Sequence, residues 1–102
     1  MKRYIHTILR GIVGGSTMLL FAACASQAPV QEMSNARQTL NLARLANAQK
    51  YAQKKYIKAQ EILDMAVTEL NSGDFTEARR LALQAAQAAR QAQLIALNQQ
   101  KK

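Results

Sequence analysis

One stretch decides the fold of this chain: NSGDFTE at residues 71–77. It interrupts a long helical pattern, because residues 34–100 contain no other Gly and no Pro. Gly73 suits the left-handed position that closes a helix. Asp74 can cap the next helix, and Glu77, three residues later, completes the residue pattern of a capping box. The stretch therefore predicts a tight turn between two helices.

On each side of this turn the apolar residues recur at helical spacing and form one stripe. At about 100° per residue, the stripe before the turn contains Ala52, Ala59, Leu63, Ala66 and Leu70, flanked by Tyr56 and Val67. The stripe after the turn contains Ala78, Ala82, Ala85, Ala89, Ala92 and Ala96, flanked by Phe75 and Leu81. Alanine lets two helix axes approach to about 8 Å. Residues 51–98 are therefore expected to form a close-packed antiparallel hairpin.

The segment before the hairpin, residues 34–48, turns its apolar residues to a different side. Ala36, Leu40 and Ala43 lie roughly 120° from the later stripe on the same helical wheel. A break near residues 47–51 would resolve this conflict and give an all-α, three-helix bundle. Its helices would span about 34–48, 51–72 and 74–98. The alternative is one straight helix over 34–71, about 57 Å long, whose first part would seek a second chain.

The first 23 residues have the layout of a secretory signal. Lys2, Arg3 and Arg10 form a basic start, and residues 11–23 carry no charge. This uncharged run is shorter than the roughly 20 residues that span a bilayer as a helix. Removal of residues 1–23 would take away these three basic residues and lower the net charge from +8 to +5.

Phe21, Ala22, Ala23 and Cys24, at the end of this run, resemble a bacterial lipobox. The resemblance implies cleavage before Cys24, a diacylglycerol group on its thiol and an acyl chain on its amine. An ordinary signal peptide with a stray cysteine and an uncleaved anchor are the alternatives. Ala25 stands where an Asp retains enterobacterial lipoproteins at the inner membrane. That similarity implies, for a Gram-negative host, an exported protein anchored in the outer membrane and facing the periplasm.

Residues 25–33 are small and polar, and they contain the one proline, Pro29. We therefore expect residues 24–33 to form a lipidated N-terminus with a flexible tether. The helical domain would then occupy residues 34–102.

The helical region also resembles the bacterial domain of unknown function numbered 4398, which occurs in short envelope lipoproteins. The matching pattern is Ala36-x3-Leu40-x2-Ala43-Arg44, Tyr51-Ala52, Ala59-x3-Leu63-x2-Ala66 and Gly73-Asp74-Phe75-x2-Ala78-Arg79-x-Leu81-Ala82. The chain departs from that family at Gln53, where a proline is common. Residues 73–89 resemble the second helix of a tetratricopeptide unit. These resemblances imply a helical hairpin in the cell envelope and no particular activity.

The residues expected after cleavage offer little catalytic chemistry. They contain no His, and a single cysteine excludes both a disulfide framework and a zinc site built from Cys and His. Glu61 and Asp64 have the spacing of a carboxylate pair, but an exposed, salt-bridged surface with Lys58 is the better interpretation. An alanine core also leaves no room for a ligand pocket. We therefore expect no enzyme activity, no metal and no cofactor apart from the lipid on Cys24.

The basic residues form one cluster and one terminal pair. Their members are Lys50, Lys54, Lys55 and Lys58, next to Tyr51 and Tyr56, and then Lys101 and Lys102. Lysines beside aromatic rings can bind nucleic acid, but export removes that partner. In the envelope the anionic partners are lipid headgroups, lipopolysaccharide phosphates and peptidoglycan carboxylates. The plain alternative is a solvated helix face.

The sequence thus favours a non-catalytic, lipid-anchored structural or adaptor protein. Its helices would bind another envelope protein or a second copy of the chain. The alternative is a peptidoglycan-contacting lipoprotein that uses the basic cluster and the C-terminal lysines. A small lysis or toxin-like lipoprotein is a weaker third hypothesis.

Overall fold

The structure is a computed structural model that describes residues 28–102, and this part of the chain is all-α. Its helices are α2 (Val30–Leu45), α3 (Ala48–Tyr51), α4 (Gln53–Ser72) and α5 (Phe75–Gln100). The expected all-α class is confirmed. The signal segment 1–23 and Cys24 lie outside the described residues.

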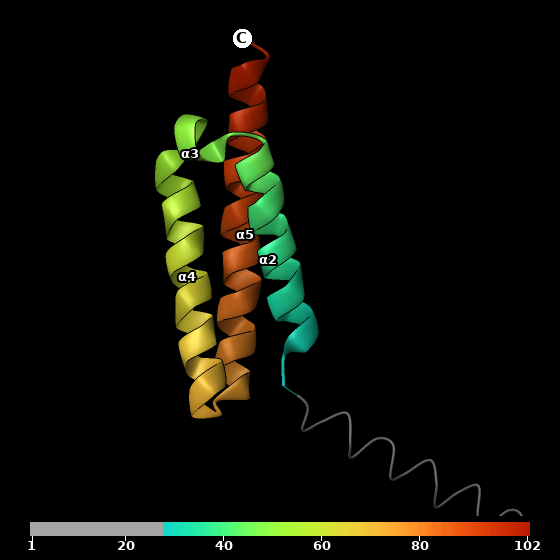
Figure 1. Ribbon diagram of the computed structural model, residues 1–102, viewed down its shortest axis with the longest axis vertical. Helices are drawn as coiled ribbons and strands as arrows, with labels where there is room; N and C mark the ends of the chain where they lie inside the picture. The colour runs from blue at the N-terminus through green and yellow to red at the C-terminus, as the bar shows by residue number, and fades with distance from the viewer. Residues whose placement is uncertain (1–27) are drawn as a thin grey trace, which may run out of the picture.

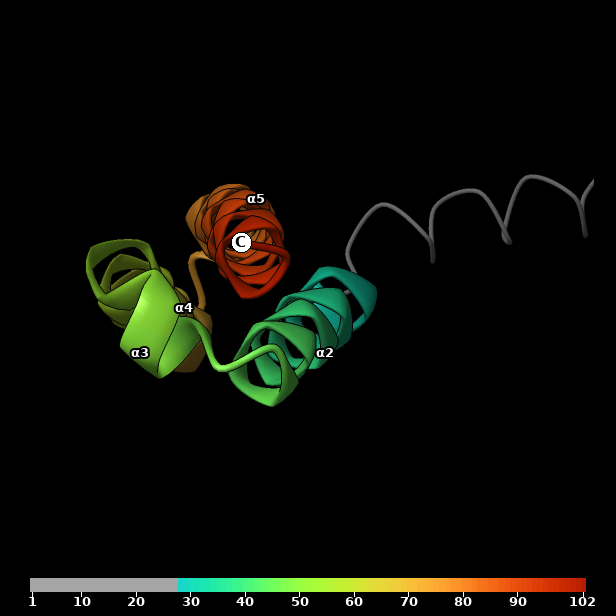
Figure 2. The ribbon, with the colours of Figure 1, turned by 90° about the horizontal axis from the view of Figure 1, so that it is seen from above.

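The three long helices form a bundle in which α5 is the shared element. Figure 1 shows that α2 and α5 run in the same direction and that α4 runs opposite to both. Seen from above in Figure 2, α2 and α4 flank α5, and α5 packs far more extensively on each of them than they pack on each other. The far end of α5 extends beyond α3 (Figure 1).

The turn at residues 71–77 has the predicted form. Gly73 adopts a left-handed conformation, with φ of 88°. The Asp74 N–H donates to the Glu69 carbonyl at 3.0 Å, and the Gly73 N–H donates to the Leu70 carbonyl at 3.1 Å. This pair of bonds is the Schellman arrangement, which satisfies carbonyls that a helix end leaves free. Glycine is favoured at this point because L-residues with a side chain are strained at such a φ.

Only half of the expected capping box forms. The Asp74 carboxylate accepts from the Glu77 N–H at 3.1 Å, as predicted. The return bond from the Glu77 side chain to the Asp74 N–H is absent from the described contacts, because Glu69 takes that N–H and Arg80 takes the Glu77 carboxylate. The prediction of a complete capping box was therefore wrong.

The core is built mainly from alanine, as the two stripes predicted. All buried hydrophobic residues in the described part of the chain are alanine except Met33, Tyr56, Ile62, Leu63 and Leu81. The post-turn stripe from Ala78 to Ala96 is buried throughout, whereas Phe75 beside it remains partly exposed. Small side chains let α4 and α5 pack closely over their common length.

The break before the hairpin is present and falls between α2 and α3. Asn47 adopts a left-handed conformation with φ of 62°, and Ala52, with φ of −143°, separates α3 from α4. This confirms the three-helix arrangement and excludes the straight helix over residues 34–71. Ala36 and Ala43 are buried as expected.

The tether prediction was wrong for residues 30–33, which form the first turn of α2. Met33 is 2% exposed and lies in the cluster that contains Ile62, Leu63 and Leu81. Its N–H donates to the Pro29 carbonyl at 3.0 Å. Proline is tolerated at a helix start because it has no N–H to satisfy there. Burial of the Met33 side chain extends the helix four residues beyond the predicted start.

Candidate functional site

The strongest site predicted from the sequence is Cys24 with its lipobox residues Phe21, Ala22 and Ala23. These four residues lie outside the part of the chain that the structure describes, so lipid attachment stays a prediction. Helix α2 begins at Val30, six positions after Cys24. The bundle would therefore join a lipid anchor at the end that contains the start of α2 and the turn at Gly73.

The predicted lysine cluster lies at the opposite end of the bundle, on α3 and the start of α4. All four lysines are exposed. The Lys55 ammonium donates to Gln91 Oε1 at 3.3 Å, and Lys50 Nζ lies 5.3 Å from the ring centroid of Tyr51, within cation–π range. Tyr56 is buried and serves the core. The expected position of Tyr56 beside the buried stripe is thus confirmed.

Because α4 runs opposite to α2 and α5, cations from the ends of α2 and α5 lie at the same end of the bundle as the lysine cluster (Figure 1). We define the basic end as Arg44, Lys50, Lys54, Lys55, Lys58, Arg90, Lys101 and Lys102. None of them forms an ion pair with an acid among residues 28–102. The ion pairs found there, Arg79–Glu32 and Arg80–Glu77, both lie near the Gly73 turn. Arg44 is held instead by a neutral acceptor, Asn41 Oδ1, at 2.6 Å.

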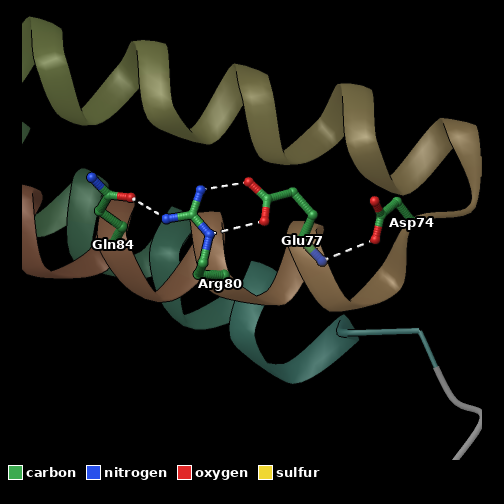
Figure 3. A network of polar contacts seen from close by, with 4 residues as sticks. All are labelled: Asp74, Glu77, Arg80 and Gln84. Atoms are coloured by element: carbon green, nitrogen blue, oxygen red, sulfur yellow. Dashed lines mark hydrogen bonds and ion pairs between the residues drawn. The ribbon is translucent and has the colours of Figure 1, made fainter.

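A polar network stabilises the first turns of α5 (Figure 3). Arg80 donates through Nε and Nη2 to the two carboxylate oxygens of Glu77, at 2.9 and 2.5 Å, and through Nη1 to Gln84 at 3.3 Å. The hydrogen bonds from Arg80 lower the pKa of Glu77, and its positive charge acts in the same direction. Because these groups pair internally and face solvent, the network is structural.

Glu61 and Asp64 line a shallow groove between α2 and α4, of about 310 Å³. Its other lining residues are Leu40, Ile57, Gln60 and Leu63. The two acids are exposed, as expected, but the expected ion pair with Lys58 is absent from the described contacts. Within residues 28–102 no group of three or more His, Cys, Asp or Glu side chains could hold a metal ion.

A second shallow groove, of about 190 Å³, lies between α4 and α5 and includes two lysines of the basic end. We name it the lysine–glutamine groove, and it is lined by Lys55, Lys58, Ile62, Gln84, Gln87, Ala88 and Gln91. Its lysines belong to the predicted cluster. The glutamines were not predicted as site residues, because on the sequence they appear only as the polar face of α5.

Large apolar side chains are exposed on the outer face of α5. Leu83 and Leu94 are each 52% exposed, and Leu97 is 40% exposed. Together with Gln87 and Arg90 they alternate at spacings of four and three residues, which places them on one helix face. On α2, Leu42 and Leu45 are exposed as well. Such side chains are suited to contact with another helix.

No protein-family model, curated protein or solved structure matches this chain. The resemblance to the domain of unknown function numbered 4398 therefore stays a prediction. Among residues 28–102, no helix has both the length and the hydropathy needed to cross a bilayer.

Proposed function

We propose that this chain is a non-catalytic, lipid-anchored lipoprotein of the cell envelope that acts as a structural or adaptor protein. The anchor is the lipid on Cys24, and the outer membrane, on its periplasmic side, is the proposed location. The helical bundle supplies the binding surface. Its partner is another envelope protein or a second copy of the chain.

The observation that carries this proposal is the exposed apolar face of α5, with Leu83, Leu94 and Leu97, on a bundle whose own core is small. A small domain with few large buried side chains gains little stability from its interior. When a partner covers these leucines, their burial contributes a favourable free energy of about 25 cal/mol per Å² of apolar surface. This burial supplements the small interior of the bundle. The lipobox pattern and the basic, then apolar, start of the sequence support export and anchoring.

Anchoring is tested with Cys24→Ala. The parent chain is expected to incorporate labelled palmitate and to be cleaved before Cys24, whereas the variant should accumulate as a precursor without label. Two or three acyl chains hold a protein firmly on a membrane, so the parent should also partition into detergent. Normal cleavage of the variant would refute the lipobox.

The adaptor role is tested by crosslinking in cells. A photoreactive residue at Leu94 should give a discrete crosslinked product, because this position lies on the exposed face. The same residue at Met65, which is 53% exposed on α4, is the matched control. Equal product patterns at both positions, or no product at Leu94, would contradict a partner on the α5 face.

A further inference from the structure

The distribution of charge along the bundle follows from its topology. Two segments of the described chain, 33–60 and 78–102, contain no acidic residue. Because α4 runs opposite to α2 and α5, the fold brings the later part of α2, the start of α4 and the end of α5 to the same end (Figure 1). The cations of the basic end therefore gather there, while Glu32, Glu69, Asp74 and Glu77 lie toward the Gly73 turn.

The basic end lies far from the point where a lipid anchor would join. Helix α5 has 26 residues, which corresponds to a length of about 39 Å. Helix α2 begins at the opposite end of the bundle (Figure 1), so the C-terminal tip of the basic end can stand up to about that distance further from the anchoring membrane. Charges are screened over about 8 Å at physiological salt. An upright bundle would therefore hold its cations beyond the field of its own membrane's headgroups.

The lysine–glutamine groove indicates what kind of anion fits this end. Its walls combine the ammonium groups of Lys55 and Lys58 with the side-chain amides of Gln84, Gln87 and Gln91. An ammonium group only donates hydrogen bonds, whereas an amide both donates and accepts. Lysine is a point charge on a flexible stem, so it pairs with carboxylate and phosphate alike, and the amides supply the selectivity for neighbouring amide and hydroxyl groups. This set suits a polymer that carries carboxylates among amide and hydroxyl groups.

We propose that the basic end binds the carboxylate-bearing polymer of the cell wall, with a short segment of that polymer seated in the lysine–glutamine groove. The proposal rests on the proposed function, since the lipid anchor supplies the location and orientation. The bundle then connects a membrane at its Gly73 end to the wall at its basic end. The partner of the α5 leucines is a separate question. Leu83, Leu94 and Leu97 are not among the residues that line the groove, although Gln87 lies on the same helix face.

The test uses the full chain, processed by its host, reconstituted in liposomes of neutral lipid and sedimented with purified wall sacculi. Binding to sacculi is expected and should weaken with added salt. Replacing Lys50, Lys54, Lys55 and Lys58 by glutamine should lower the affinity by roughly tenfold or more, whereas arginine at the same positions should preserve it. Sacculi with amidated carboxylates should not bind.

The groove is tested separately by Gln87→Glu, which places a negative charge between the two helices without removing a hydrogen bond that the structure shows. It should weaken binding to sacculi. Gln31→Glu adds the same charge at an exposed position in the first turn of α2, at the opposite end of the bundle. This control variant should bind sacculi as the parent does. Circular dichroism of both variants should match the parent.

Three results would overturn the proposal. They are equal binding by the parent and the fourfold glutamine variant, binding that survives amidation of the sacculi, and tighter binding to anionic lipid vesicles than to sacculi, which would assign the basic end to a lipid surface. A chain that never enters the liposomes contradicts the proposed lipid anchor. The free chain is then sedimented with sacculi, so the wall-binding result is still obtained.

Discussion

Asn47 shows how one residue can set the path of this chain. It holds a left-handed backbone between α2 and α3, and its side chain makes no capping hydrogen bond. Its contribution is therefore its tolerance of a positive φ, which asparagine shares with glycine more than other residues do.

The first prediction is that Asn47→Ala destabilises the bundle whereas Asn47→Gly does not. Alanine in the left-handed region costs about 1 kcal/mol, and glycine has no such penalty. Urea unfolding of a form that begins at Ala25, followed by circular dichroism, measures the difference. Equal stability of the two variants would mean that the backbone at this position relaxes at no cost.

The Glu77–Arg80 pair gives a prediction on pH. Because Arg80 lowers the pKa of Glu77 in the folded chain, the folded state favours the ionised carboxylate. The stability that this adds is present above the ordinary glutamate pKa of about 4.3 and is lost as the pH falls through the folded value. A carboxyl titration by NMR should give a midpoint below the ordinary value. In Arg80→Gln the midpoint should rise back toward it, and an unchanged midpoint would rule out Arg80 as the cause.

At the scale of the element, the first turn of α2 owes its position to Met33. Met33→Ala should lower the free energy of unfolding by about 2 kcal/mol or more, because it empties a buried site. Ser34→Ala, at the exposed neighbour, should change it by less than about 0.5 kcal/mol. Urea unfolding of both variants makes the comparison. If the two substitutions have the same small effect, residues 30–33 behave as the tether that the composition predicts.

The contact between α4 and α5 depends on the small size of its buried side chains. Ala85→Leu or Ala89→Leu should overpack this interface at a cost of roughly 1–3 kcal/mol. Gln87→Leu adds the same side chain at an exposed position of α5 and should be nearly neutral. Thermal melting of the three variants compares them, and an unchanged melting temperature for Ala85→Leu would show that the stripe is not the interface.

The sequence predicts the elements whose signals are local. Gly73 and Asp74 mark the turn, and the alanine spacing marks the buried faces of α4 and α5. The exact break was harder to place, because asparagines also occur inside α2, at Asn35 and Asn41. The start of α2 was missed because Met33 finds its neighbours on α4 and α5, far away in the sequence. The lysines of the site were predicted, but their position beside the glutamines of α5 follows only from the topology.

For the whole molecule, the exposed leucines predict self-association when no other partner is present. A form that begins at Ala25 should sediment as a mixture of species that shifts with concentration, and its melting temperature should rise with concentration as well. Leu94→Gln combined with Leu97→Gln should shift the mixture toward the monomer. Met65→Gln, on α4, should leave it unchanged. A parent that is monomeric at all concentrations would exclude the second copy and leave an envelope protein as the partner.

The alanine interior also limits how such a chain can diverge over evolutionary time. At most of its buried positions only glycine is smaller, and glycine inside a helix costs about 1 kcal/mol. Any larger residue separates the helices. Smaller and larger residues in the interior both cost stability, so we expect substitutions to be tolerated better at the outward positions than at the buried alanines. Recognition of distant relatives would then depend on a periodic pattern of one small residue, which pairwise sequence similarity detects poorly.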